Sequence, residues 1–432
     1  MGKNKKEEPK KNVDTLQNNE LLRLSTAGSV DDGKSTLIGR LLYDTKSVMK
    51  DQYEAVRATS KKKGEEEVNL AYLTDGLKSE REQGITIDVA YRYFNTANRK
   101  FIISDTPGHV QYTRNMITGA SKSNVAIILV DARKGISEQT RRHSFIASML
   151  KIPHVIYAVN KMDLIDYNEQ KFNKIRDGLK EFSAKLRCND IRFIPISALK
   201  GDNVTTKSQK TKWYKGAHML QMLEQIEIFS DNNLVDARFD IQTVIRPHSD
   251  KWHDFRGYAG KIVSGRFQVG HKVQVLPSGF ETRISAMRIY KDELEEACIP
   301  ASVIMQLEDD IDAGRGDMIA RVDNLPVVKQ NFDAMICWMS DDQMLPRKKY
   351  ILKHGSNEVV CMVTKKLYTL DVNTFSKADD QSLKIGLNDI ARISIKTSKP
   401  VCVDDYESNR ANGSFILIDQ QTNETIAAGM IK

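Results

Sequence analysis

The sequence predicts an α/β domain, built on a mostly parallel sheet with helices on both faces, followed by two β-barrel domains. Over the first half of the chain, short apolar runs alternate with amphipathic stretches, which is the pattern of parallel strands joined by helical crossovers. After residue 236 the helical patterns give way to strand-length segments spaced by roughly 8–12 residues, as in small barrels. A chain of 432 residues also exceeds one ordinary hydrophobic core.

The α/β region contains apolar runs of strand length, separated by stretches with a helical period. The runs cover residues 22–26, 87–94, 101–104, 125–130, 155–159 and 193–196. The helical patterns cover residues 35–43, 110–120, 137–150, 169–186 and 218–226. A polar insertion, SKKKGEEE at 60–67, matches neither pattern, and we expect it to lie in a mobile loop.

The barrel region divides into two series of strands. The first series contains FDIQTVIRP, YAGKIVSG, HKVQVLPSG and TRISAMRIY. The second begins near Phe332 and contains MICWM, VVCMVTKKLY, IARISIKT and GSFILID. We therefore predict a disordered basic tail at 1–20, the α/β domain at 21–232, one barrel at 233–328 and a second barrel at 329–432.

The composition is typical of a soluble globular protein, with 40% hydrophobic and 28% charged residues. No apolar run approaches the roughly 18 residues that cross a bilayer, so we expect no membrane partner. The five cysteines are scattered without a Cys-x-x-Cys pair, which is typical of reduced thiols and of a cytoplasmic location. Part of the net charge of +8 lies in the tail, and we expect no nucleic-acid partner.

A glycine-framed turn separates the first apolar run from the first helical pattern. Its residues are Gly28, Ser29, Val30, Asp31, Asp32, Gly33, Lys34 and Ser35. A strand before such a turn and a helix after it are the context of a phosphate-binding loop, in which backbone N–H groups and the helix N-terminus surround a β-phosphate. Lys34 can then reach the β- and γ-phosphates, and the Ser35 hydroxyl can bind Mg²⁺.

Two further segments predict a sensor of the third phosphate. The first, directly after the run 101–104, comprises Asp105, Thr106, Pro107, Gly108 and His109. A carboxylate at the end of a strand can hold Mg²⁺ through water, and the glycine lets a backbone N–H approach the γ-phosphate. The second segment contains Thr86, whose hydroxyl can complete the Mg²⁺ shell only when the γ-phosphate is present. We predict Ser35, Thr86 and Asp105 as the metal ligands.

A base-recognition motif follows the fifth apolar run. It comprises Asn160, Lys161, Met162 and Asp163. The Asp163 carboxylate can accept hydrogen bonds from N1–H and from the 2-amino group of guanine, a donor pair that adenine lacks. Because an unpaired buried acceptor is costly, the motif favours GTP over ATP. The turn of Ser197, Ala198 and Leu199, after the last run, is predicted to offer a backbone contact to the guanine O6, and Ser197 and Ala198 are its predicted base-binding residues. The predicted cofactors are therefore GTP and Mg²⁺.

These motifs, in this order and ahead of two barrels, resemble the translational GTPases typified by elongation factor Tu. Within that superfamily, four stretches are similar to the GTPase subunit of bacterial heterodimeric sulfate adenylyltransferase: GSVDDGKSTLIGRLLYD, LTDGLKSEREQGITIDVAYRYF, DTPGHVQYTRNMITGAS and NKMDL. The ending GSFILIDQQTNETIAAGMI is also similar to that family. The resemblance covers residues 21–432 and implies that His109 positions the attacking water, with Lys34 and Thr86 completing the catalytic set.

The resemblance also implies that two subunits catalyse different reactions. Adenylyl transfer from ATP to sulfate would occur on a partner, a catalytic adenylyltransferase subunit with a pyrophosphate loop of the Ser-Gly-Gly-Lys-Asp-Ser type, and this chain would hydrolyse GTP to drive it. The two would form a heterodimer or a larger assembly. The alternative is a translation factor that delivers aminoacyl-tRNA. Such factors usually carry a His before the second Gly of the phosphate loop, where this chain has Asp32.

Overall fold

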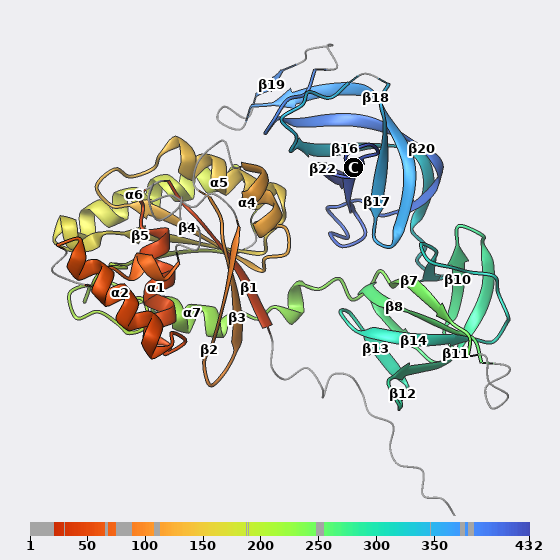
Figure 1. Cartoon of the computed structure of the whole chain (residues 1–432), viewed down its shortest axis with the longest axis horizontal. Helices are drawn as coiled ribbons and strands as arrows, with labels where there is room; N and C mark the ends of the chain where they lie inside the picture. The colour runs from red at the N-terminus through yellow and green to blue at the C-terminus, as the bar shows by residue number, and fades with distance from the viewer. Residues whose placement is uncertain are drawn as a thin grey trace, which may run out of the picture. The chain divides into compact units, whose positions relative to one another are not determined.

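The computed structural model describes residues 21–29, 31–64, 68–74, 89–107, 113–186, 188, 190–247, 255–345, 347–371, 376–378 and 384–432 (Figure 1). These residues form two compact units, one ending at Ile228 and the other beginning at Phe229. The predicted tail at 1–20 lies outside the described residues, as do Val30, Thr86, Gly108 and His109.

The first unit is built on a six-stranded sheet in the order β2-β3-β1-β4-β5-β6. Its strands are β1 (Leu21–Ala27), β2 (Ala90–Asn95), β3 (Lys100–Asp105), β4 (Val125–Asp131), β5 (His154–Asn160) and β6 (Asp190–Pro195). The edge strand β2 pairs antiparallel with β3, whereas the other strand pairs are parallel. The C-terminal ends of the parallel strands therefore meet at one end of the sheet, where open sheets of this kind bind their ligands.

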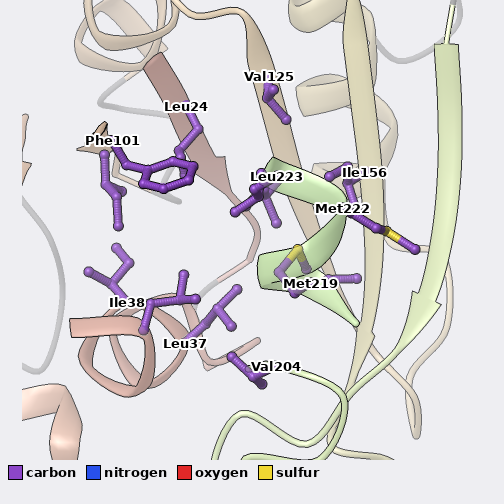
Figure 2. Close-up of a cluster of buried hydrophobic side chains, with 14 of the residues drawn as sticks. Leu24, Leu37, Ile38, Phe101, Val125, Ile156, Val204, Met219, Met222 and Leu223 are labelled. Atoms are coloured by element: carbon purple, nitrogen blue, oxygen red, sulfur yellow. The ribbon is translucent and has the colours of Figure 1, made fainter. Parts of the chain in front are cut away.

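Helices cover both faces of this sheet. They are α1 (Lys34–Asp44), α2 (Lys50–Lys62), α4 (Thr113–Ala120), α5 (Glu138–Met149), α6 (Glu169–Ser183) and α7 (Met219–Gln225), with short 3-10 turns at η2 (Leu70–Leu73) and η4 (Met162–Ile165). On one face α1 and α7 bury apolar side chains such as Leu37 and Leu223 (Figure 2). On the other face the Tyr157 hydroxyl lies 2.9 Å from Ser144 of α5 and 3.1 Å from Ser183 of α6.

The sheet pattern explains why the fold could be predicted from the sequence. Every residue of β4 is buried, as expected for a central parallel strand covered on both sides. Alternate residues of the strands enter the core below α1 and α7, because successive side chains point to opposite faces. The predicted α/β fold is confirmed. None of the described helices is both long and apolar enough to span a bilayer.

The prediction of a loop at 60–67 is wrong for its first residues. Residues 60–62 form the last turn of α2, and residues 65–67 lie outside the described part of the chain. Ser60 is buried and its hydroxyl accepts a hydrogen bond from the Asn69 N–H over 2.9 Å. Lys61 and Lys62 lie where the helix dipole favours positive charge. The sequence does not indicate α2 because this polar helix buries only Val56 and Ser60.

The second unit, which begins with the short turn η5 (Phe229–Asp231), consists of two closed six-stranded barrels, as predicted. The first barrel contains β7 (Arg238–Ile245), β8 (Gly257–Ser264), β10 (Lys272–Leu276), β11 (Phe280–Ile289), β14 (Ser302–Leu307) and β15 (Met318–Arg321). Three short strands accompany it: β9 (Arg266–Gln268), β12 (Asp292–Leu294) and β13 (Glu296–Cys298). The pairing of β10 with β11 closes this barrel.

The second barrel contains β16 (Val327–Trp338), β17 (Lys349–His354), β18 (Asn357–Leu370), β20 (Ile390–Val403), β21 (Ser414–Asp419) and β22 (Thr425–Ile431). The pairing of β17 with β18 closes it, and the short β19 (Lys377–Ala378) extends one edge. Strand β16 begins ahead of Phe332, where the sequence pattern starts. Its first residues, Val327 and Val328, are exposed, so no buried alternation marks the start.

A buried ion pair joins the two barrels. Arg238, at the start of β7, makes two hydrogen bonds of 2.9 Å to the Asp404 carboxylate, which follows β20. The Arg238 side chain is 1% exposed and that of Asp404 is 11% exposed. Asn409 supports the pair by donating to Asp404 over 2.9 Å and to Ser264 over 2.8 Å. Removing one partner would leave the other charge buried and unpaired.

We therefore expect Arg238→Ala to lower the free energy of unfolding of the barrel unit by about 3–5 kcal/mol. Urea unfolding of the full chain, followed by tryptophan fluorescence, measures this change. Arg288→Ala is the matched control, because Arg288 pairs with Glu293 at a more exposed position and its loss should cost less than about 1 kcal/mol. Equal losses in the two variants would contradict this account of the barrel contact.

Candidate functional site

The predicted phosphate loop is a closed turn between β1 and α1. The Ser29 N–H donates to the Asp32 carboxylate over 2.7 Å, and the Asp32 N–H donates back to the Ser29 carbonyl over 3.2 Å. Lys34 is buried and begins α1, and Ser35 follows in the same helical turn. Among the described residues, no side chain caps the N-terminus of α1. The first N–H groups of this helix are therefore available to an anion.

The side chain of Asn160, at the end of β5, joins the phosphate loop to the base-recognition loops. Its Nδ2 donates to the Asp32 carbonyl over 2.7 Å, and its Oδ1 accepts from the Ala198 N–H over 2.9 Å. Asn160 is buried, so both bonds are made away from water. Gly33, with a φ of 92°, fits beside it, because a Cβ there would lie 2.4 Å from Asn160 Nδ2. One carboxamide thus brings together three separate segments of the sequence.

The remaining residues of the base-recognition motif, Lys161, Met162 and Asp163, follow Asn160 directly in the chain. Lys161 has a positive φ of 64° and turns the chain into η4. Met162 is fully buried, and its N–H donates to the Ile196 carbonyl over 3.2 Å, directly before Ser197. Asp163 lies half-buried in the first turn of η4. The structure therefore places the Asn160–Asp163 loop beside the Ser197–Ala198 turn, as base recognition requires.

Asp131, at the end of β4, is a candidate site residue that lies outside the predicted motifs. Its buried carboxylate lies 3.1 Å from Lys161 Nζ and 2.7 Å from Arg133 Nη2. Burial alone would raise the pKa of Asp131, but the hydrogen bonds from Arg133 and Lys161 hold it below its ordinary value. A fixed negative charge therefore anchors Lys161. A carboxylate that ends the apolar run VAIILV is the signal that could have identified it.

Asp105 lies at the same end of the sheet as the phosphate loop. It ends β3, pairs in register with Thr26 of β1, and is buried. The Thr26 hydroxyl donates to Asp105 over 3.3 Å, and the Thr106 hydroxyl donates to the Thr26 carbonyl over 2.6 Å. Pro107 is also buried. The Asp105 carboxylate and the Ser35 hydroxyl are both hard oxygen donors, so this donor set fits Mg²⁺.

The electrostatics of the phosphate loop differ from those of a solvated turn. Burial raises the pKa of Asp32 to about 6, although the Ser29 N–H opposes this rise. His143 of α5 is fully buried close to Lys34, and burial lowers its pKa to about 3, so its ring is neutral at physiological pH. The imidazole therefore adds no positive charge to the loop, whose neighbouring cations include Lys34, Lys134 and Lys161.

A polar network supports the far side of the base loop. The Tyr167 hydroxyl donates to Asp202 Oδ2 over 2.5 Å, and Lys210 Nζ and the Ser208 hydroxyl also bind this carboxylate. The Asp202 carbonyl in turn accepts from the Ser197 N–H over 3.1 Å. The residues of this network lie up to 43 positions apart in the sequence, so no local pattern could indicate it.

A strand-loop-helix phosphate site, a buried carboxylate on the neighbouring strand and base loops joined by an asparagine define a P-loop nucleotide-binding domain of the GTPase type. A family model described as the elongation factor Tu GTP binding domain matches residues 19–241. A second model, the GTP-eEF1A C-terminal domain-like family, matches residues 331–432.

Relatives of known name match nearly the whole chain. The bifunctional enzyme CysN/CysC of Mycobacterium tuberculosis is 54% identical over 95% of this chain and 67% of its own length. Sulfate adenylyltransferase subunit 1 of Alteromonas mediterranea is 51% identical over 95% of this chain and 87% of its own. The chain belongs to the sulfate adenylyltransferase subunit 1 family of elongation factor Tu-type GTPases. These relatives favour that family over the alternative of a translation factor.

A solved structure agrees with the fold. The GTPase-like domain of Saccharomyces cerevisiae Ski7, bound to GDP and inorganic phosphate, matches with a TM-score of 0.52 at 17% identity, covering 97% of this chain and 98% of that one. At this level of identity the likeness concerns the arrangement of the domains' elements alone.

We expect Asp32 to titrate near pH 6. Because its folded pKa lies above the ordinary value of 3.8, the stability it contributes is fully present below about pH 4 and is lost as the pH rises through about 6. A ¹³C-NMR titration of the aspartate carboxyl groups in the nucleotide-free protein should show one midpoint near 6 that Asp32→Asn removes. Asp51→Asn, on the exposed face of α2, is the control and should leave that midpoint in place. A midpoint near 4 for Asp32 would refute the buried environment.

Proposed function

We propose that this chain is the GTP-hydrolysing subunit of a sulfate adenylyltransferase. Hydrolysis of GTP to GDP and phosphate would drive transfer of the adenylyl group from ATP to sulfate on a separate catalytic subunit, which yields adenylyl sulfate and diphosphate. The observation that carries the proposal is the Asn160 contact, which joins a phosphate loop to guanine-type base loops in a chain of this family.

Selection of guanine rests on Asp163 and on the turn at Ser197 and Ala198. Asp163 accepts from the N1–H and the 2-amino group, and the turn donates to the base carbonyl. A base without these groups leaves buried polar atoms unpaired, which supports a preference for GTP of ~10⁴ or more.

The residues around the phosphates would neutralise negative charge and position the attacking water. Backbone N–H groups of residues 28–35 and the α1 N-terminus surround the β-phosphate, and Lys34 neutralises charge that develops on the γ-phosphate. Ser35, Asp105 and Thr86 would hold Mg²⁺, which supplies positive charge to the phosphates. His109 would position the attacking water. Thr86 and Gly108 would distinguish GTP from GDP, because only GTP offers the third phosphate.

The reaction that GTP hydrolysis would drive is the reason to expect a partner subunit. Forming a phosphosulfate anhydride from ATP is uphill, so it needs a coupled downhill step, and coupling requires contacts that differ between the GTP and GDP states. A relative named as subunit 1 supports a second subunit on which the transfer takes place. The free thiols of all five cysteines support a cytoplasmic location for the complex.

Asp163→Asn tests this function by changing the nucleotide that drives the reaction. An amide can donate to a carbonyl at C2 and accept from N1–H, which matches xanthine in place of guanine. With the partner subunit, ATP and sulfate, the natural chain should accelerate adenylyl sulfate formation with GTP, and the variant should do so with XTP. We expect the preference for GTP over XTP to fall by ~100-fold or more, measured as diphosphate release.

Asp166→Asn is the matched control, because Asp166 is exposed and lies in the same loop at a positive φ that asparagine tolerates. It should leave the nucleotide preference unchanged. If GTP fails to accelerate the reaction of an active partner subunit, the coupling is refuted. If Asp163→Asn keeps the GTP preference, Asp163 does not contact the base.

A further inference from the structure

Arg40 connects helix α1 to the turn that follows β6. Its Nε donates to the Ala198 carbonyl over 3.2 Å, and its Nη2 donates to the Leu199 carbonyl. One planar guanidinium therefore holds two successive carbonyls in a fixed relative geometry, which the flexible ammonium of a lysine cannot do. These carbonyls belong to the turn for which we propose contact with guanine.

Helix α1, which carries Arg40, is anchored in the hydrophobic core and can hold this contact in place. Its inner side chains Leu37, Ile38 and Leu41 are fully buried, whereas the Arg40 side chain lies on the flank and is 21% exposed. One turn further along, Asp44 lies 3.7 Å from Arg40 Nη1. Arg40 thus joins the turn to the same helix that begins in the phosphate loop.

Arg40 also contacts the turn beyond these two carbonyls. A Cβ at Gly201 would lie 3.6 Å from Arg40 Cδ, so the arginine stem packs under this glycine. Asp44, the ion-pair partner of Arg40, accepts from the Thr205 hydroxyl over 2.6 Å. The segment from Ala198 to Thr205 is therefore attached to α1 at several points.

Because a trans peptide unit is planar, the contact that holds the Ala198 carbonyl also fixes the direction of the Leu199 N–H. The carbonyl of Ala198 and the N–H of Leu199 belong to one planar unit, in which they point in opposite directions. Because Arg40 holds the carbonyl, the Leu199 N–H is directed away from the guanidinium.

The neighbouring N–H groups of the turn already donate hydrogen bonds within the protein. The Ala198 N–H donates to Asn160, and the Lys200 N–H donates to the Ser197 hydroxyl over 3.2 Å. Within the described part of the chain, the Leu199 N–H makes no hydrogen bond. It is therefore the donor that this turn can offer to a ligand.

We propose that Arg40 is a positioning residue for base recognition, which orients the Leu199 N–H toward the carbonyl at C6 of guanine. This proposal rests on the proposed binding of GTP and adds to it a residue that does not touch the nucleotide. Within the predicted turn of Ser197, Ala198 and Leu199, it assigns the donor to Leu199.

The test compares GDP with 6-thio-GDP, in which sulfur, a weak acceptor, replaces the base carbonyl oxygen while N1–H and the 2-amino group remain. Dissociation constants are measured by calorimetry on the full chain. The natural chain should bind GDP ~10-fold more tightly than 6-thio-GDP. Arg40→Ala should weaken GDP binding by ~10-fold and 6-thio-GDP binding by less than ~2-fold, so that the ratio approaches one.

Two further variants make the comparison decisive. Arg40→Lys keeps the positive charge but loses the two-pronged guanidinium. Its ratio of 6-thio-GDP to GDP dissociation constants should lie between those of the natural chain and Arg40→Ala. If Arg40→Ala does not fold, Arg40→Lys tests the proposal in its place. Arg57→Ala removes an exposed arginine of α2 and should leave both constants unchanged.

The outcomes separate this proposal from the function on which it rests. Equal weakening of both nucleotides, or no weakening of either, would overturn the positioning role of Arg40. A natural chain that binds neither GDP nor GTP would overturn the proposed function itself, before any variant is compared.

Discussion

The buried carboxamide of Asn160 is the interaction on which the nucleotide site depends. Strand β4 lies between β1 and β5, so the loops that follow β1 and β5 start about 10 Å apart. Asn160 closes this distance by donating to the phosphate loop and accepting from the turn after β6. Leaving either end of a buried amide unpaired costs about 1–3 kcal/mol, so the three segments are held in one arrangement.

The two halves of the site are attached to the sheet in different ways. The base half is held by hydrogen bonds between buried or half-buried groups, as at Met162 and Asp202. The proposed γ-phosphate sensors lie in segments that enter and leave β2, β3 and α4. Ala90 pairs in register with Asp105, so the segment before β2 joins the sheet beside the proposed metal ligand.

The sequence predicts the fold, and it predicts that the phosphate loop, Asp105 and Asn160–Asp163 lie at one end of the sheet, because these signals are local. Apolar runs mark the strands, and the phosphate loop and Asn160–Asp163 stand at strand ends where the topology must bring them together. Arg40, Tyr167 and Asp202 could not be predicted, because their partners lie far away in the sequence and their contacts depend on the folded turn. The sequence does not indicate the polar helix α2 for a related reason, since a helix that buries only Val56 and Ser60 shows no apolar stripe.

Amide hydrogen exchange at Ala198 tests most directly whether Asn160 assembles the site. In the nucleotide-free protein, Asn160→Ala should accelerate exchange of the Ala198 N–H by roughly tenfold or more, because it removes the acceptor. The Ile196 N–H, which donates to the Val159 carbonyl over 2.8 Å, is the internal reference and should exchange at an unchanged rate. Unchanged exchange at Ala198 would contradict the role given to Asn160.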